Sequence, residues 1–151
     1  MRIYTVYFLF ATILLFILIL ASCNPFGKTD VMNYEDELSD LIGKLEKYPQ
    51  GYYDEDEIDE VSTFYLRRLR IDSIIKNGDK SYCSYCHGFI EDSDSLVIFI
   101  NKSDNMFDTE KRIIYDYKKE PRNFKNQIIS GAAYEFTQVG ERWYYSETGF
   151  D

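Results

Sequence analysis

The feature that most constrains this chain is an almost wholly apolar run near its start, from Val6 to Ala21. Only Tyr7 and Thr12 carry polar side-chain atoms within the run, and Arg2 places a positive charge before it. A charged start, an apolar centre and a small-residue exit are the three parts of a secretory signal. The run therefore predicts export, and the folded part must be built from the residues that follow it.

The exit of this run reads Leu20-Ala21-Ser22-Cys23, which resembles the lipobox of bacterial lipoproteins at every position. The resemblance covers residues 1–23 and implies that residues 1–22 form a signal peptide, which is removed. It also implies that Cys23 becomes the first mature residue and carries a diacylglyceryl thioether, usually with an N-linked acyl chain such as palmitate. Stable anchoring needs more than one chain, so the acylated Cys23 is the expected link to a lipid membrane.

An uncleaved signal anchor is the alternative, because about sixteen apolar residues approach the length that spans a bilayer. In some bacteria an acidic residue after the lipidated cysteine retains a lipoprotein in the inner membrane, whereas Asn24 follows here. The sequence favours the outer membrane over the inner membrane. It leaves open which face of that membrane the domain occupies.

Length and composition limit what the mature chain can be. About 128 residues remain after the leader, which suits one domain of ordinary size. The formal net charge of −9 argues against nucleic acid as a partner, because binding it needs a basic surface. Fourteen Tyr, eleven Phe and one Trp can remove a large apolar area from water, so a core can form without a metal.

Two amphipathic stretches follow a polar segment. Residues 23–32 lack periodicity and are expected to be the lipidated cysteine and a tether, with a single domain over 33–151. Apolar residues at helical spacing then predict a helix from Asn33, which can cap it, to Pro49, which stops it. The spaced residues are Tyr34, Leu38, Leu41, Ile42, Leu45 and Tyr48.

A second helix is predicted from Ile58, through Val61, Tyr65 and Leu69, and on towards Ile75. Its acidic beginning and basic end match the helix dipole. The alternative for residues 71–86 is a hairpin around Asn77-Gly78, which is a strong turn signal. The helix is the preferred interpretation.

The sequence after residue 86 has the character of strands. The segments Leu96–Ile100, Arg112–Tyr117, Ala132–Gln138 and Arg142–Thr148 are predicted strands, the last two flanking a turn at residues 139–141. Four antiparallel strands in sequence order, covered by the two helices, would give a two-layer α+β domain. This order of elements is similar to cystatin-like and nuclear-transport-factor-like folds, a likeness of outline that implies no function.

The sharpest chemical motif of the mature chain is Cys83-Ser84-Tyr85-Cys86-His87-Gly88. It resembles the attachment site of c-type cytochromes, in which both thiols bind haem and the histidine ligates the iron. The resemblance implies haem c on Cys83, Cys86 and His87, with Met106 as a sixth ligand. A cytochrome of that class would be mostly helical, whereas the residues after Gly88 read as strands.

The two cysteines also have a simpler interpretation. Lipidation uses Cys23, which leaves Cys83 and Cys86 as an even pair able to form a local disulfide in an oxidising compartment. Free thiols and a redox-active pair stay open, although the βαβ context of a thioredoxin-like site is missing. Zinc would have these cysteines and His87 but no identifiable fourth ligand, so no metal site is predicted.

The last predicted strand carries Trp143, Tyr144 and Tyr145. Alternation places Trp143 and Tyr145 on one face, where they would form either an aromatic platform for a sugar or peptide or ordinary core. The sequence shows no catalytic set. It favours a non-enzymatic lipoprotein, acting as a binding or accessory module of the cell envelope with a protein or glycan partner; the alternative is a lipid-anchored electron carrier.

Overall fold

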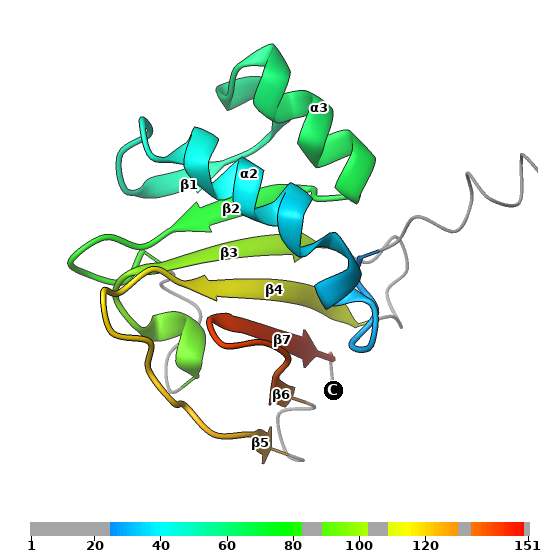
Figure 1. Ribbon diagram of the computed structural model, residues 1–151, viewed down its shortest axis with the longest axis vertical. Coiled ribbons are helices and arrows are strands. Elements are labelled where there is room, and N and C mark those ends of the chain that lie inside the picture. Colours follow the sequence, from blue (N-terminus) through cyan, green and yellow to red (C-terminus); the bar gives the residue numbers. More distant parts are fainter. Residues whose placement is uncertain (1–24, 83–88, 103–108, 130–133, 150–151) are drawn as a thin grey trace, which may run out of the picture.

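Seven antiparallel strands form one sheet in the part of the chain that the structure describes, and two helices lie against one of its faces (Figure 1). The structure is a computed structural model, and it describes residues 25–82, 89–102, 109–129 and 134–149. The strands are ordered β1-β2-β3-β4-β7-β6-β5. The α+β class and the antiparallel sheet expected from the sequence are thereby confirmed.

The elements follow one another along the chain as short 3-10 turns, two helices and seven strands. Their bounds are η1 Val31–Tyr34, α2 Glu35–Leu45, β1 Gly51–Tyr53, η2 Glu55–Glu57, α3 Glu60–Leu69, β2 Ser73–Lys76, η3 Ile90–Asp92, β3 Leu96–Asn101, β4 Glu110–Asp116, β5 Gln127–Ile129, β6 Tyr134–Gln138 and β7 Trp143–Thr148.

Helix α2 occupies the first amphipathic stretch and buries Leu38, Leu41 and Leu45, three residues of the expected stripe. Helix α3 occupies the second, and Asp59 caps its start by accepting hydrogen bonds from the backbone N–H groups of Val61 and Ser62. The same carboxylate accepts a 2.6 Å hydrogen bond from the Tyr48 hydroxyl, just after α2. Asp59 therefore both begins α3 and ties it to the end of α2.

The second helix ends earlier than the sequence predicts. It stops at Leu69, where Arg70 adopts a left-handed conformation with φ 55° and its N–H reaches the carbonyls of the last turn. The preferred helical interpretation of residues 71–76 is wrong, because Ser73–Lys76 form β2 between β1 and β3. Ile74 and Ile75 enter the cores on opposite faces of the sheet. A strand buried on both faces has a continuous apolar run that periodicity cannot separate from a helix.

The sheet has more strands than the predicted four, and they are not in sequence order. Strand β7 pairs with both β4 and β6, so it lies between them. The short strands β1 and β5 form the two edges, and β2 extends the sheet beyond β3. The expected turn after β6 is present, with the Val139 N–H donating to the Trp143 carbonyl over 2.9 Å. After β4 the chain runs to the far edge of the sheet, where it forms β5. It then returns through β6 and this hairpin to β7, next to β4.

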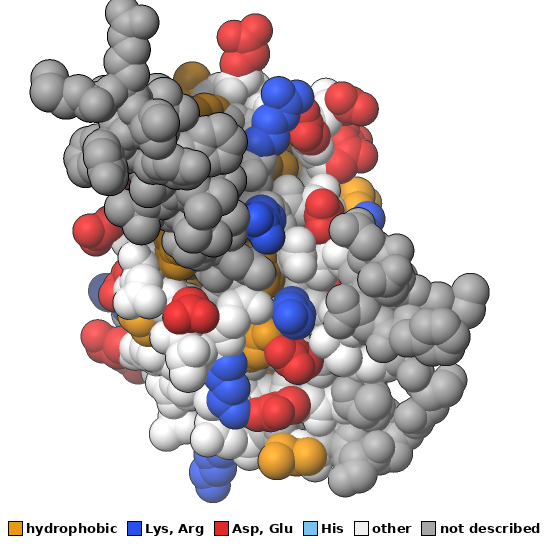
Figure 2. Space-filling model, turned by 90° about the vertical axis from the view of Figure 1, so that its right-hand side faces the viewer, with side chains coloured by type: hydrophobic (Ala, Val, Ile, Leu, Met, Phe, Trp, Pro, Cys, Tyr) orange, Lys and Arg blue, Asp and Glu red, His pale blue; other side chains and the backbone are white. Residues whose placement is uncertain are grey.

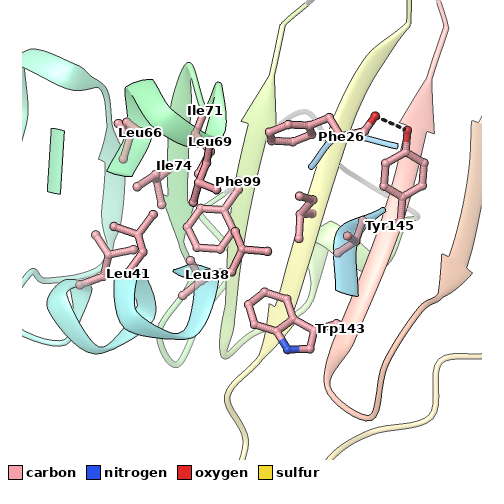
Figure 3. Packing of buried hydrophobic residues seen from close by; sticks show 14 residues of the cluster. Phe26, Leu38, Leu41, Leu66, Leu69, Ile71, Ile74, Phe99, Trp143 and Tyr145 are labelled. Carbon is pink, nitrogen blue, oxygen red and sulfur yellow. Dashed lines mark hydrogen bonds between the residues drawn. The ribbon is translucent and has the colours of Figure 1, made fainter. Parts of the chain in front are cut away.

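Alternation along the strands gives the sheet two separate cores. The face under α2 and α3 contains Leu38, Leu66, Phe99 and Trp143 among its buried residues (Figure 3). The opposite face is built around Ile98, Ile114, Phe136 and Tyr144 and is also covered by the 3-10 turn η3. Both faces of the central strands are thus withdrawn from water.

The folded unit begins earlier than the tether expected at residues 23–32 would allow. Phe26 is 1% exposed and Val31 is 0% exposed, and both belong to the core on the helix side of the sheet. The Tyr145 hydroxyl donates a 3.4 Å hydrogen bond to the Phe26 carbonyl, as Figure 3 shows. The domain therefore begins before the expected boundary at residue 33, at the start of the described chain. The polar segment before α2 is held to the sheet by its two buried apolar side chains, Phe26 and Val31.

Candidate functional site

The residues of the cysteine motif lie outside the described part of the chain. Cys83, Cys86 and His87 fall in one gap, Met106 falls in another, and Cys23 precedes the first described residue. The disulfide and haem interpretations therefore stay predictions from the sequence.

The aromatic platform expected at Trp143 and Tyr145 is part of the core. Each side chain is 2% exposed, so neither ring presents a face to a ligand. The Trp143 ring packs on Tyr115 with 4.7 Å between the ring centroids. Burial, and then the hydrogen bond to Glu147, raise the pKa of Tyr145, so its hydroxyl stays a donor. The packing alternative of the sequence analysis accounts for both residues.

The most completely built polar site lies on the other face of the sheet. It consists of Glu91, Glu110, Arg112, Tyr134 and Ser146, and we call it the Glu91 cluster. Glu91 is 0% exposed, and its carboxylate accepts a 2.6 Å hydrogen bond from Ser146 Oγ and a 2.9 Å bond from the Tyr134 hydroxyl. The cluster joins the turn η3 to strands β4, β6 and β7.

Arg112 lies between two carboxylates of the Glu91 cluster. Its guanidinium is 3.4 Å from Glu91 Oε1, and its Nε donates to Glu110 Oε1 over 2.6 Å. Only 6% of the Arg112 side chain is exposed, against 21% for Glu110. A charge withdrawn from water is tolerated when it is paired and hydrogen-bonded. The arginine therefore offsets the desolvation of the buried glutamate.

The local sequence explains how these residues meet. Arg112 and Ser146 are register partners on β4 and β7, so their side chains share one face of the sheet. Tyr134 comes from the next strand and stacks on Phe89, with ring centroids 4.3 Å apart. Phe89 and Ile90 flank Glu91 with apolar surface, which brings η3 down onto the sheet. Sequence reasoning missed this site because its members come from four segments and match no motif.

The arrangement favours a structural role over a catalytic one. Both oxygens of Glu91 already accept hydrogen bonds from side chains of the cluster. Burial, and then the charge of Glu91, raise the pKa of Tyr134, which keeps that hydroxyl protonated. A general base needs a free lone pair within reach of a substrate proton. The Glu91 carboxylate is instead fully buried, and each of its oxygens already accepts a hydrogen bond within the cluster.

A second buried carboxylate, Asp116, lies at the opposite end of β4. It is 0% exposed and accepts hydrogen bonds from Arg122 Nε at 3.0 Å and from the same residue's second terminal nitrogen at 2.9 Å. Backbone N–H groups of Lys118 and Arg122 add bonds of 3.1 and 3.0 Å. Arg122 continues to Asp94 at 2.8 Å, so this network closes the loop after β4 onto the turn before β3.

The network at Asp116 predicts a dependence of stability on pH. Burial raises the pKa of Asp116, but the hydrogen bonds from Arg122 and Lys118 together outweigh it and hold the pKa below its usual value. A depressed pKa contributes stability at pH values above the unfolded pKa of ~3.9, and this stability is lost as the pH falls through the folded pKa. Asp116→Asn is expected to lower the free energy of unfolding at pH 7 by about 1.5–3 kcal/mol, the worth of charge-assisted hydrogen bonds.

Urea unfolding between pH 7 and pH 3 measures this effect. The difference between the native protein and Asp116→Asn should shrink as the pH falls towards 3, because the unfolded chain takes up a proton on Asp116 before the folded protein does. Glu120→Gln, an exposed position in the same loop, is the matched control and should change little at either pH. A difference for Asp116→Asn that stays constant over this range would contradict the ionic network.

A small cavity of roughly 320 Å³ lies between α2 and the sheet. Ile42, Leu45, Val97, Tyr115 and Tyr117 supply most of its wall, and Lys76 reaches into it. The Lys76 ammonium donates to three carbonyls at the end of α2, at 2.7, 2.8 and 3.3 Å. That cation is therefore occupied in capping the helix and is not presented to a ligand.

Comparison with known proteins found no family, curated protein or solved structure that matches this chain. Within the described ranges, no helix has the length and apolar character needed to cross a bilayer. The same ranges hold no group of three or more His, Cys, Asp or Glu side chains arranged to bind a metal ion.

Proposed function

We propose that this protein is an exported lipoprotein held to a membrane through an acylated Cys23, with its α+β domain acting as a non-enzymatic binding or accessory module of the cell envelope. The sequence Leu20-Ala21-Ser22-Cys23 at the end of the apolar run carries this proposal. Pro25 and Phe26, the first residues that the structure describes, are buried, so the folded domain follows closely on the acylated cysteine. Removal of residues 1–22 would leave every described core residue in place.

The accessory role is supported by the polar sites of the domain. The carboxylates of Glu91 and Asp116 are buried and hydrogen-bonded within the domain, which suits contacts that hold loops to the sheet. A protein or glycan partner of the envelope fits an acidic chain better than nucleic acid does. Asn24 after the cysteine favours the outer membrane. The likeness to cystatin-like and nuclear-transport-factor-like proteins stays one of element order and adds no function.

Mass spectrometry of the membrane fraction tests the anchor. The mature protein is expected to start at Cys23 and to carry the added mass of a diacylglyceryl group, with or without a further acyl chain. Cys23→Ser should abolish this modification and leave the leader attached, because the thiol is the acceptor. Cys83→Ser is the matched control and should be processed normally. A membrane-bound native protein that retains Met1 would overturn the lipoprotein proposal.

The mass and the absorbance spectrum of the same protein test the alternative electron-carrier function. Haem attached through Cys83 and Cys86 would add a covalent mass and give a Soret absorption band when the haem-attachment machinery is present. A colourless protein without that mass would reject the alternative. The two cysteines would then be a disulfide or free thiols, and the disulfide form is lighter by two hydrogen atoms.

A further inference from the structure

The distance between Cys23 and the folded core limits how the domain can lie on a membrane. Only Asn24 and Pro25 separate the cysteine from Phe26, which is 1% exposed. At roughly 3.3–3.6 Å per residue, the link from Cys23 to Phe26 spans at most about 10 Å. The described chain is also held by its neighbours, since Phe26 accepts a hydrogen bond from Tyr145 and Lys28 pairs with Glu135.

These contacts place the start of the domain at one end of the sheet. Strands β3 and β7 end here, and strands β4 and β6 begin here, so we call it the anchor end. The other end holds the starts of β3 and β7 and the end of β4 at Asp116. Strand β4 has seven residues and is roughly 20 Å long. The distal end is therefore farther from Phe26 than the link can reach.

The side chains at the anchor end suit a lipid surface. Ile128 on the edge strand β5 is 76% exposed, against 51–58% for Val61, Phe64 and Tyr82. It is the register partner of Glu135, which pairs with Lys28. An exposed apolar residue beside a lysine can enter the headgroup layer while the ammonium stays in water.

The described lysines of the anchor end lie beside acidic residues. Lys28 pairs with Glu135, Lys111 is the register partner of Glu147, and the Lys102 backbone N–H donates to Asp72. Figure 2, which looks onto this end, shows basic side chains spaced down its middle among acidic ones. A polybasic patch would select anionic lipids, whereas described charges of alternating sign do not. The chemistry therefore fits a phospholipid headgroup layer without a requirement for negative charge.

We propose that the anchor end of the sheet, with Ile128 and Lys28, lies against the bilayer, and that the distal end with Asp116 and Lys119 points away from it. This inference rests on the proposed acylation of Cys23 and adds the orientation of the domain. It assigns the bilayer as the partner of the anchor end and leaves the distal loops accessible to other envelope components.

Depth-dependent quenching tests the orientation in the complete mature lipoprotein. A fluorescent amino acid is incorporated in place of Ile128 or, in a second protein, in place of Lys119, which is exposed and whose carbonyl is held by Arg142 at 3.1 Å. Each protein is reconstituted at low density into phosphatidylcholine vesicles containing brominated lipid. Quenching is expected to be several-fold stronger at position 128 than at position 119, and to stay so when phosphatidylglycerol is added.

The possible results separate the orientation from the anchor. Equal quenching at both positions, or stronger quenching at 119, in a protein that carries the acyl mass and floats with the vesicles overturns the orientation alone. A protein without acyl mass on Cys23 overturns the proposed function and the orientation together. Strong quenching at 128 only with phosphatidylglycerol would overturn the assignment of a charge-independent headgroup contact.

Discussion

Glu91→Ala is expected to lower the free energy of unfolding by about 3–5 kcal/mol, the usual cost of breaking a buried ion pair by removing one partner. The substitution deprives Tyr134 and Ser146 of the acceptor for their hydroxyl groups, at 2.9 and 2.6 Å. It also leaves Arg112 with less compensation inside the core, because its side chain is only 6% exposed. Urea unfolding followed by circular dichroism measures the loss.

Two further variants show whether the charge or the packing is responsible. Glu110→Ala removes the more exposed carboxylate of the same cluster and should cost less than Glu91→Ala. The double variant Glu91→Leu with Arg112→Met replaces the pair by apolar groups and should recover part of the stability, as such replacements often do. If Glu91→Ala cost no more than Glu110→Ala, the Glu91 cluster would not hold η3 to the sheet as described.

The sequence predicts those parts of the fold in which local pattern and burial agree. The stripe of Leu38, Leu41 and Leu45 has one exposed and one buried face, so its period identifies a helix. The alternation of Trp143 and Tyr144 likewise indicates a strand, and the structure places them on opposite faces of the sheet. Pattern fails at Ile74 and Ile75, which are buried on both faces and therefore show no alternation.

Strand order and the buried polar residues depend on contacts distant in sequence. No local sequence pattern places β7 between β4 and β6, because that order depends on pairing between strands that are far apart in the sequence. Glu91 looks like a surface residue in the sequence, since its partners are 43 and 55 positions away. Unless its hydrogen-bond partners are known, an acidic residue in the sequence carries no signal that distinguishes a buried ion pair from a solvated charge.

Phe26→Ala is expected to destabilise the domain by about 3–5 kcal/mol, the range for removing a fully buried aromatic side chain. The sequence places Phe26 in a tether, where the change would cost almost nothing, whereas the structure places it in the core with 1% exposure. Thermal and urea unfolding of the mature protein separate these outcomes. Thr29→Ala, three residues later and exposed, is the matched control and should leave the midpoint nearly unchanged.

The same substitution connects the stability of the domain to its position on the membrane. Releasing residue 26 from the sheet would lengthen the free link after Cys23 to the next buried contact at Val31, roughly 26–29 Å of chain at full extension. That length exceeds the roughly 20 Å of strand β4. In Phe26→Ala protein that is still folded, the difference in lipid quenching between positions 128 and 119 should therefore fall. A variant that loses stability but keeps the full difference would show that other contacts, such as the pair of Lys28 with Glu135, hold the orientation.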